Sequence, residues 1–295
     1  MGDSRKETMS LWSDVRGTVA AVLLASLAGA WAAGPAWAQT ADMPAPIDTD
    51  PTLPVGPGVP GDEARVLMTV RGGISVSPSY FGSDDYKLAP DAAVRFDFAR
   101  LPGGFDWGSA GPAAPGTRSG WDIRGSARYV GGRDGSGKLA GLDDIDPSFE
   151  AGFGLGYEQR NYRVFTDVRY GIVGTNAWTG EVGADGIARP MPGLTLMLGP
   201  RLAFGDDRFA ATYFGVSDSE AAASGLAPYN AEGGLYSAGI EVGARYMVGS
   251  RWGVEGAASW NRLVNSAGDS PIPETGSQDQ YRIRLGLTRS LSLDF

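Results

Sequence analysis

The chain has 295 residues, with 45 glycines, no cysteine, no histidine and a formal net charge of −9. Without cysteine or histidine it can form no disulfide, no thiolate zinc site, no His-ligated metal site and no Ser-His-Asp triad. The glycine content is about twice the usual ~7% and disfavours a helical protein, because an interior glycine costs a helix about 1 kcal/mol. The negative charge argues against nucleic acid as a partner, since phosphate binding needs a basic surface.

Residues 1–38 have the organisation of a secretory signal peptide. Basic residues precede an alanine-rich apolar run over 18–34, and Ala36 and Ala38 then give the small-x-small pattern of a cleavage site. A membrane-spanning anchor is the alternative, but the run is marginal in length for a span. We therefore expect cleavage after Ala38.

Residues 39–65 predict a proline-rich periplasmic extension. Six prolines fall within 41–60, and proline at that density favours extended polyproline II at about 3.1 Å per residue. We expect a solvated tether; a recognition segment is the alternative.

Residues 66–295 alternate apolar and polar side chains in the manner of β-strands. Near the carboxyl end, Tyr281, Ile283 and Leu285 alternate with Arg282 and Arg284. Side chains on a strand alternate faces, so each such segment has one apolar and one polar face. Strands are expected at 66–77, 88–99, 120–131, 148–159, 162–173, 177–189, 194–205, 233–248, 251–263 and 279–295, with a weaker one at 208–216.

Aromatic residues distinguish a membrane barrel from a soluble β-sandwich, which would alternate in the same way. Eight residues span about 27 Å of strand, or roughly 21 Å of height at a tilt of about 40°. This is close to the ~25 Å apolar band between the aromatic girdles of an outer-membrane barrel. The predicted girdle consists of pairs eight residues apart on one apolar face: Trp121 and Tyr129, Phe149 and Tyr157, Tyr162 and Tyr170, and Trp252 and Trp260.

The expected fold is therefore an all-β, transmembrane antiparallel β-barrel in the outer membrane, with an even number of strands because both ends lie on the periplasmic side. With ten strands, the short links 159–162, 190–193 and 248–251 all fall on that side. Residues 206–232 then form one long external excursion, with a small hairpin at most. Twelve strands are the alternative. The long glycine-rich link 100–119 has no physical explanation in this count.

The polar faces predict an ionic network that fills the lumen. Arginine forks suit bidentate pairing with carboxylates in a confined space. The network is expected to include Arg124, Arg128, Glu150, Arg163, Asp167, Arg169, Glu241, Arg245, Glu255, Arg282 and Arg284. Such a barrel should be narrow or closed, since only about 16–18 strands leave a wide channel. Arg289 falls on the apolar face, where we expect it to snorkel or to lie beside a bulge.

Catalytic chemistry finds little support in the sequence. The paired acids Asp84-Asp85, Asp143-Asp144 and Asp206-Asp207 fall on expected loops, where adjacent residues are poorly placed for a two-carboxylate mechanism. They are expected to form solvated turns or loose divalent-ion contacts beside lipopolysaccharide. The glycine-rich run 131–138 lacks the strand-loop-helix context of a phosphate loop. We expect that the protein is not an enzyme and that it has no catalytic, cofactor-binding or metal-binding residue.

Several motifs in order resemble the MipA/OmpV family of outer-membrane proteins. They include Pro78-Ser79-Tyr80-Phe81-Gly82, Tyr213-Phe214-Gly215-Val216-Ser217 and Asp269-Ser270-Pro271-Ile272. The resemblance implies an outer-membrane barrel in lipid bilayer and lipopolysaccharide. The resemblance also implies a scaffold role, because the members that give the family its name look like scaffolds that hold a lytic transglycosylase, MltA, together with a penicillin-binding protein. Other members are linked to adhesion, osmotic response or drug entry.

The carboxyl terminus also predicts a partner. Leu291, Leu293 and the terminal Phe295 look like the signal that the barrel assembly machinery reads; an ordinary strand end is the alternative. The leading functional hypothesis is a non-enzymatic scaffold for peptidoglycan-remodelling enzymes. A narrow small-solute channel, or an envelope-stress or adhesion barrel, is the alternative.

Overall fold

The computed structural model describes residues 65–101, 105–108, 120–249 and 251–294. The predicted cleavage residues Ala36 and Ala38, the extension up to residue 64 and the terminal Phe295 lie outside these ranges. Their predicted roles therefore stay predictions.

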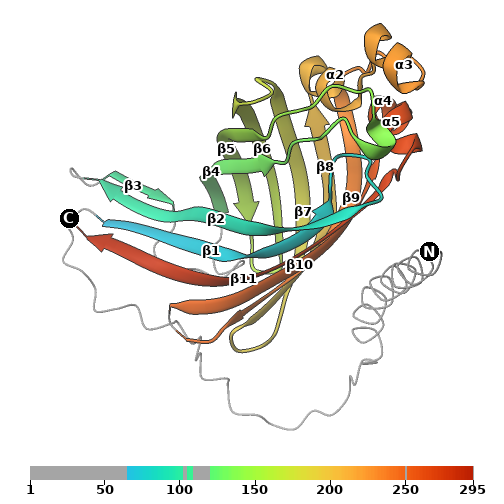
Figure 1. The fold of residues 1–295 in the computed structure, drawn as a ribbon. Coiled ribbons are helices and arrows are strands. Elements are labelled where there is room, and N and C mark those ends of the chain that lie inside the picture. Colours follow the sequence, from blue (N-terminus) through green and yellow to red (C-terminus); the bar gives the residue numbers. More distant parts are fainter. Residues whose placement is uncertain (1–64, 102–104, 109–119, 250, 295) are drawn as a thin grey trace, which may run out of the picture. The chain divides into compact units, whose positions relative to one another are not determined.

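The described chain is a single antiparallel sheet with short helices at one end (Figure 1). The strands are β1 (Arg65–Pro78), β2 (Tyr86–Leu101), β3 (Phe105–Gly108), β4 (Gly120–Val130), β5 (Ser148–Glu158), β6 (Tyr162–Val173), β7 (Trp178–Met191), β8 (Leu194–Gly205), β9 (Gly234–Met247), β10 (Trp252–Leu263) and β11 (Asp279–Asp294). The helices are η1 (Gly137–Leu139), α2 (Asp207–Phe214), α3 (Asp218–Ser224), α4 (Asn265–Gly268) and α5 (Pro271–Glu274).

Strand order in the sheet is β3-β2-β1-β11-β10-β9-β8-β7-β6-β5-β4. The first and last long strands, β1 and β11, are paired from Arg65 with Asp294 to Val76 with Ile283. The sheet curls, and its edges approach each other where β2 and β3 lie near β4. This is the antiparallel barrel wall that the alternation predicts.

Short turns join β5 to β6, β7 to β8 and β9 to β10 at the end where β1 begins and β11 ends. Because consecutive strands run antiparallel, the longer loops lie together at the opposite end, where Figure 1 shows the helices. None of the helices in the described residues is long and apolar enough to cross a membrane.

The link over 100–119 is partly explained by the structure. β2 continues to Leu101, and β3 folds back on it, with Leu101 paired to Phe105 and Phe98 to Gly108. This hairpin makes the sheet eleven-stranded, with ten long strands and one of four residues.

The prediction of a weak strand at 208–216 was wrong. Residues 207–214 form helix α2, because the side chain of Asp206 caps it by accepting from the backbone N–H of Phe209 at 2.8 Å. The small hairpin considered for 206–232 is also replaced by helices α2 and α3, with a single bridge between Val216 and Tyr229.

Candidate functional site: the barrel interior and its cap

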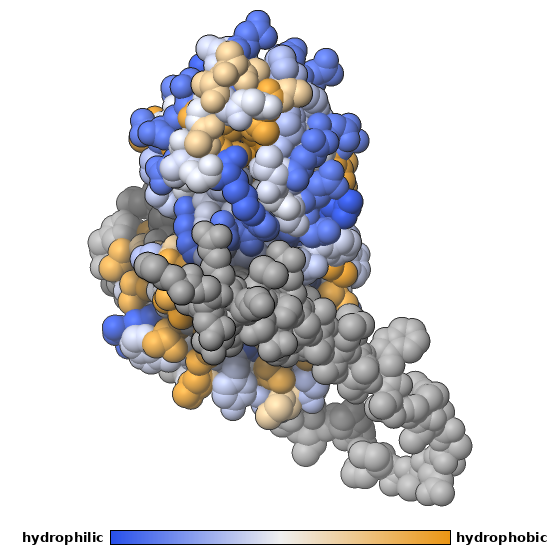
Figure 2. Space-filling view, turned by 45° about the vertical axis from the view of Figure 1, so that its right-hand side comes forward, coloured by the Kyte–Doolittle hydropathy of each residue, from blue (hydrophilic) through white to orange (hydrophobic). Residues whose placement is uncertain are grey.

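The outer wall of the sheet carries apolar side chains. In β5, Phe153 is 71% exposed and Leu155 is exposed, whereas Glu150 and Glu158 on the other face are buried. Val168 and Ile172 of β6 are exposed in the same way. Figure 2 shows hydrophobic residues along the strands and mainly hydrophilic ones over the helical end. A water-soluble sheet would bury the apolar face, so this wall is built to face lipid.

The predicted girdle residues lie at two levels of this wall. Trp121 is paired with Tyr157 near the short turns, with ring centroids 5.2 Å apart, and Tyr162 lies 6.4 Å from Tyr157. Tyr129 is paired with Phe149 at the helical end. The remaining members follow the same two levels: Trp252 near the short turns, and Tyr170 and Trp260 near the loops.

Arg289, the charge expected on the apolar face, lies over the ring of Trp252 with its guanidinium carbon 5.0 Å from the centroid. It is opposite Trp252 in the ladder, near the short-turn end of β11. A cation on an aromatic face at the membrane boundary avoids the cost of a midplane charge.

Ion pairs cover much of the inner wall. Arg163 contacts Asp185 at 2.5 Å, and Asp185 also binds Arg201 at 2.7 Å. Arg201 reaches Glu241 at 3.3 Å, and Glu241 is held by Arg284 at 3.0 Å. The pairs therefore run continuously from β6 to β11.

A second series crosses the first and last strands. Arg245 pairs with Glu255, and Glu255 binds Arg71 at 2.9 Å. Arg71 lies 3.0 Å from Asp91, and Arg282 reaches the same carboxylate at 3.7 Å. Asp91 was not among the predicted network residues, although it shares strand parity with Arg95 and Asp97. We call the residues of these two series the main ion-pair array.

A third group lies on β4 to β7. The fully buried Glu150 accepts two hydrogen bonds from Arg128 at 2.9 Å and one from Thr179 at 2.7 Å. Arg169 lies 3.4 Å from Asp167 and 3.5 Å from Glu181. Of the expected network residues, only the Arg124 side chain lies outside the described part of the chain.

Two aromatic residues face inward. Tyr236 shares strand parity with the exposed Ile240 and Tyr246, but the β8–β9 register shifts between Ala203 and Phe204 and turns it inward, where its hydroxyl accepts from Arg128 at 3.0 Å. Phe165 lies between the guanidinium groups of Arg163 and Arg201, at 5.0 and 5.1 Å. Glycine-rich strands make room for such rings. A Cβ at Gly183, for example, would lie 2.4 Å from the Phe165 ring.

The loops at the helical end pack into one structure, which we call the cap (residues 79–85, 131–147, 206–233 and 264–278). Phe209 is fully buried at its centre, with Phe81, Tyr213, Phe214 and Tyr236 all within 6.2 Å between ring centroids. A second apolar cluster packs beside this one and consists of Leu139, Leu142, Val216 and Ile272.

Polar contacts tie the cap loops together. The hydroxyl of Ser270 donates to the carbonyl of Phe214 at 2.7 Å, and both groups are buried. Glu220 of α3 accepts from the backbone N–H of Asp143 at 3.0 Å. Burial raises the pKa of Glu220, but the N–H donors of Ser217 and Asp143 outweigh it and lower that pKa overall.

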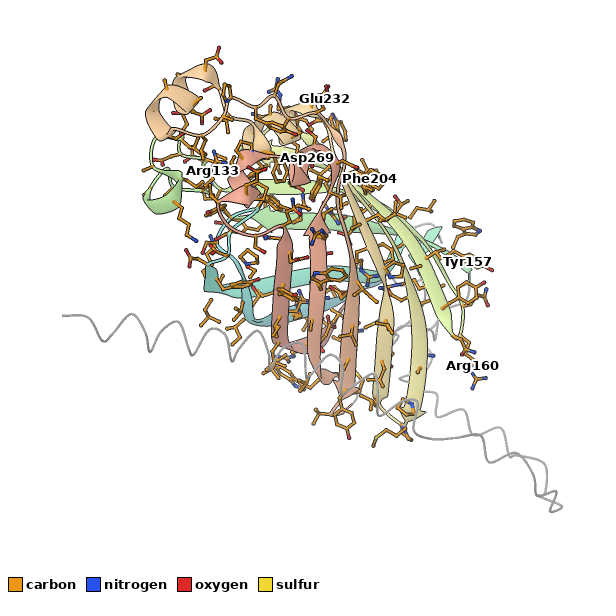
Figure 3. The ribbon with its side chains drawn as sticks, turned by 90° about the vertical axis from the view of Figure 1, so that its right-hand side faces the viewer. Arg133, Tyr157, Arg160, Phe204, Glu232 and Asp269 are labelled. Carbon is orange, nitrogen blue, oxygen red and sulfur yellow. The ribbon has the colours of Figure 1, made fainter. Side chains whose placement is uncertain are left out.

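The cap also holds a buried cation. Arg133 is 4% exposed and donates to the carbonyl of Tyr213 at 3.2 Å. Burial lowers the pKa of Arg133, and burial raises the pKa of Tyr213 to about 12. Figure 3 shows Arg133, Glu232 and Asp269 at this end and Tyr157 and Arg160 at the other.

The acid pairs have structural partners. Asp84 accepts from Lys138 at 2.7 Å, Asp144 accepts from the N–H of Gly135 at 2.6 Å, and Asp206 caps α2. Hydrogen bonding to Asp84 raises the pKa of Lys138. Within the described ranges, no group of three or more acids is placed to hold a metal ion.

Outward apolar side chains, inward ion pairs and two levels of aromatic rings define an outer-membrane β-barrel. The family described as MltA-interacting protein MipA matches residues 70–291. The chain therefore belongs to the MipA family, which confirms the predicted resemblance and the outer-membrane location. In such barrels short turns face the periplasm and longer loops face outward, so the cap is extracellular.

Similar solved structures include an outer membrane channel from Pseudomonas putida F1, 12% identical, covering 79% of this chain and 97% of that chain with a TM-score of 0.41. The outer membrane protein OprD from Pseudomonas aeruginosa is 12% identical, with coverages of 78% and 94% and a TM-score of 0.29. The NanC porin is 9% identical, with coverages of 77% and 100% and a TM-score of 0.34. No curated protein sequence matches the chain.

Proposed function

We propose that this barrel is a non-enzymatic outer-membrane scaffold for peptidoglycan-remodelling enzymes, a lytic transglycosylase of the MltA type and a penicillin-binding protein. The observation that carries the proposal is the ion-paired interior together with the packed cap. Charged side chains are paired along the wall from β6 to β2, and the cap packs an apolar core over the extracellular mouth. A barrel built in this way is a stable anchor with a fixed position in the membrane, and it does not offer a wide path for solutes.

The acid pairs support the non-enzymatic part of this proposal. Hydrolysis by two carboxylates needs one of them available to accept or deliver a proton. Here Asp84 is bound to Lys138, and Asp206 accepts the backbone N–H groups of Phe209 and Trp178 at 2.8 and 2.9 Å. Each of these carboxylates holds a loop in place.

The periplasmic end is the surface that a cell-wall enzyme would reach. The β5–β6 turn presents the exposed Arg160 there (Figure 3), and the β2–β3 hairpin lies at the same end. The extension 39–65, which is expected to be a tether, would enlarge this surface.

The proposal is tested by capture. The full mature barrel in detergent micelles is immobilised, and a purified MltA-type transglycosylase and a bifunctional penicillin-binding protein are applied separately. We expect retention of at least one enzyme and weaker retention by a variant without residues 39–65. A cap variant, Glu232→Gln, is the matched control and should bind as the parent does.

Absence of retention for both enzymes would contradict the scaffold function. The alternative, a narrow small-solute channel, predicts discrete conductance steps in planar bilayers. For a scaffold we expect none from the unmodified barrel, and steps that respond to Glu241→Gln would favour the channel.

A further inference from the structure

The main ion-pair array has more cations than carboxylates. Its positive members are Arg71, Arg163, Arg201, Arg245, Arg282 and Arg284, and its negative members are Asp91, Asp185, Glu241 and Glu255. Within the described residues, six arginines of the array therefore share four carboxylates. A guanidinium that shares its carboxylate with another cation keeps N–H donors available to an added anion.

This sharing leaves Arg282 with the longest contact of the array. Its contact with Asp91 is 3.7 Å long, and that carboxylate already binds Arg71 at 3.0 Å. Within the described residues no hydrogen bond to the Arg282 guanidinium is found, whereas Arg284 makes two to Glu241 at 3.0 and 3.1 Å. Arg282 is therefore the least satisfied cation of the array.

Arg282 is the most exposed arginine of the array. Its side chain is 45% exposed. On β11 it shares the inward face with the buried Gln280 and Thr288, whereas Ile283 and Leu285 are exposed on the lipid face. Its exposed donors therefore lie on the inward face of the sheet, near the cap end of β11.

Two further arginines flank this position. Arg71 shares the Asp91 carboxylate with Arg282, and Arg284 lies two residues further along the inward face of β11. The Nε atoms of Arg71 and Arg284 are buried and have no hydrogen-bond partner within the described structure. Arg71 and Arg284 therefore add positive charge beside Arg282, whose own side chain is exposed.

We propose that Arg282, flanked by Arg71 and Arg284, forms a binding site in the lumen for a small soluble oxyanion that carries a carboxylate or phosphate group. A guanidinium fork matches both groups, and arginine-lined interiors select anions in pores. The site does not depend on the scaffold function.

Calorimetric titration of the full mature barrel in detergent tests this site, with sodium phosphate and sodium succinate as probes at constant ionic strength. We expect saturable binding by at least one probe and a loss of affinity of about tenfold or more in Arg282→Gln. Arg208→Gln removes the same charge from the exposed surface of α2 and should bind as the parent does. Equal affinities for the two variants, or no saturable binding by the parent, would overturn the proposal.

A second variant keeps the test decisive if Arg282→Gln fails to fold, which is checked by heat-dependent migration on gels. Asp91→Asn removes the competing carboxylate between Arg71 and Arg282 and should tighten binding severalfold; weaker binding would count against the site. Repeating the titration in phosphatidylglycerol nanodiscs separates soluble anions from lipid headgroups. Unchanged affinity for phosphate in the nanodiscs supports a soluble anion as the ligand. Loss of phosphate binding in the nanodiscs would instead show that a lipid headgroup occupies the site.

Discussion

The cap and the barrel interior lie along the same axis, yet they are filled by opposite chemistry. The cap buries Phe209, Phe214 and Ile272 completely, as the core of a water-soluble protein does. The lumen buries Glu150, Asp185 and Arg245 instead. The surroundings explain the difference, because strands in lipid place their apolar side chains outward and leave the polar ones inside. Where the chain leaves the membrane and meets water, apolar residues turn inward again.

The largest effect is expected in the cap. Phe209→Ala removes the central ring of the aromatic cluster and should destabilise the cap by about 3–5 kcal/mol. Limited proteolysis and hydrogen exchange should show 206–233 and 264–278 opening, while the strands keep their heat-dependent gel migration. Phe153→Ala, on the lipid face of β5, is the control and should leave the cap protected. Equal protection of the cap in both variants would contradict the packing described for it.

The wall is tested by a charge on its lipid face. Val168 is exposed on β6, and Val168→Arg should cost about 2–4 kcal/mol in lipid vesicles. Urea unfolding monitored by tryptophan fluorescence measures the loss, with Val168→Ala as a neutral control. If arginine proved as well tolerated as alanine, position 168 would not face the hydrocarbon.

The lumen is tested by removing one buried charge. Glu150→Gln leaves Arg128 without its carboxylate and should lower the free energy of unfolding by about 2–3 kcal/mol. The double replacement Arg128→Met with Glu150→Leu should recover most of that loss, since it leaves no unpaired buried charge. A double variant less stable than Glu150→Gln would show that the pair contributes more than charge balance.

Strand parity is a local property, and it predicted which side chains face the lumen. Arg128 and Glu150, or Arg245 and Glu255, are brought together by the ladder as parity requires. Parity fails at a bulge, which turned Tyr236 inward. It also says nothing of partners two strands apart, such as Arg284 and Glu241.

The cap was harder to predict because its contacts join segments distant in sequence. Ser270 binds Phe214, and Gln280 accepts from the N–H of Gly82 at 3.2 Å. Helix α2 had a local signal that the strand interpretation overlooked. Asp206 is a typical N-cap residue, and Phe209 and Tyr213 are spaced by one helical turn on the buried face.

The smallest effect concerns the pH dependence of the cap. Glu220 has a lowered pKa because the Ser217 and Asp143 donors outweigh burial. Its contribution is therefore present above the unfolded glutamate pKa of about 4.3 and is lost as the pH falls through the lowered folded value. Since the carboxylate is partly exposed, this contribution should stay within about 1 kcal/mol.

Urea unfolding of the cap, followed by near-ultraviolet circular dichroism, compares the parent with Glu220→Gln at pH 6 and about pH 3. The stability difference between the two proteins should be present at pH 6 and smaller at pH 3, because it is lost as the pH falls from the unfolded pKa through the lowered folded pKa of Glu220. Glu232→Gln is the matched control, since that exposed side chain forms no hydrogen bond or ion pair within the described residues, and it should show no difference at either pH. A difference for Glu220→Gln that persists in acid would mean that the geometry of the amide, and not the charge, weakens the contact with Asp143.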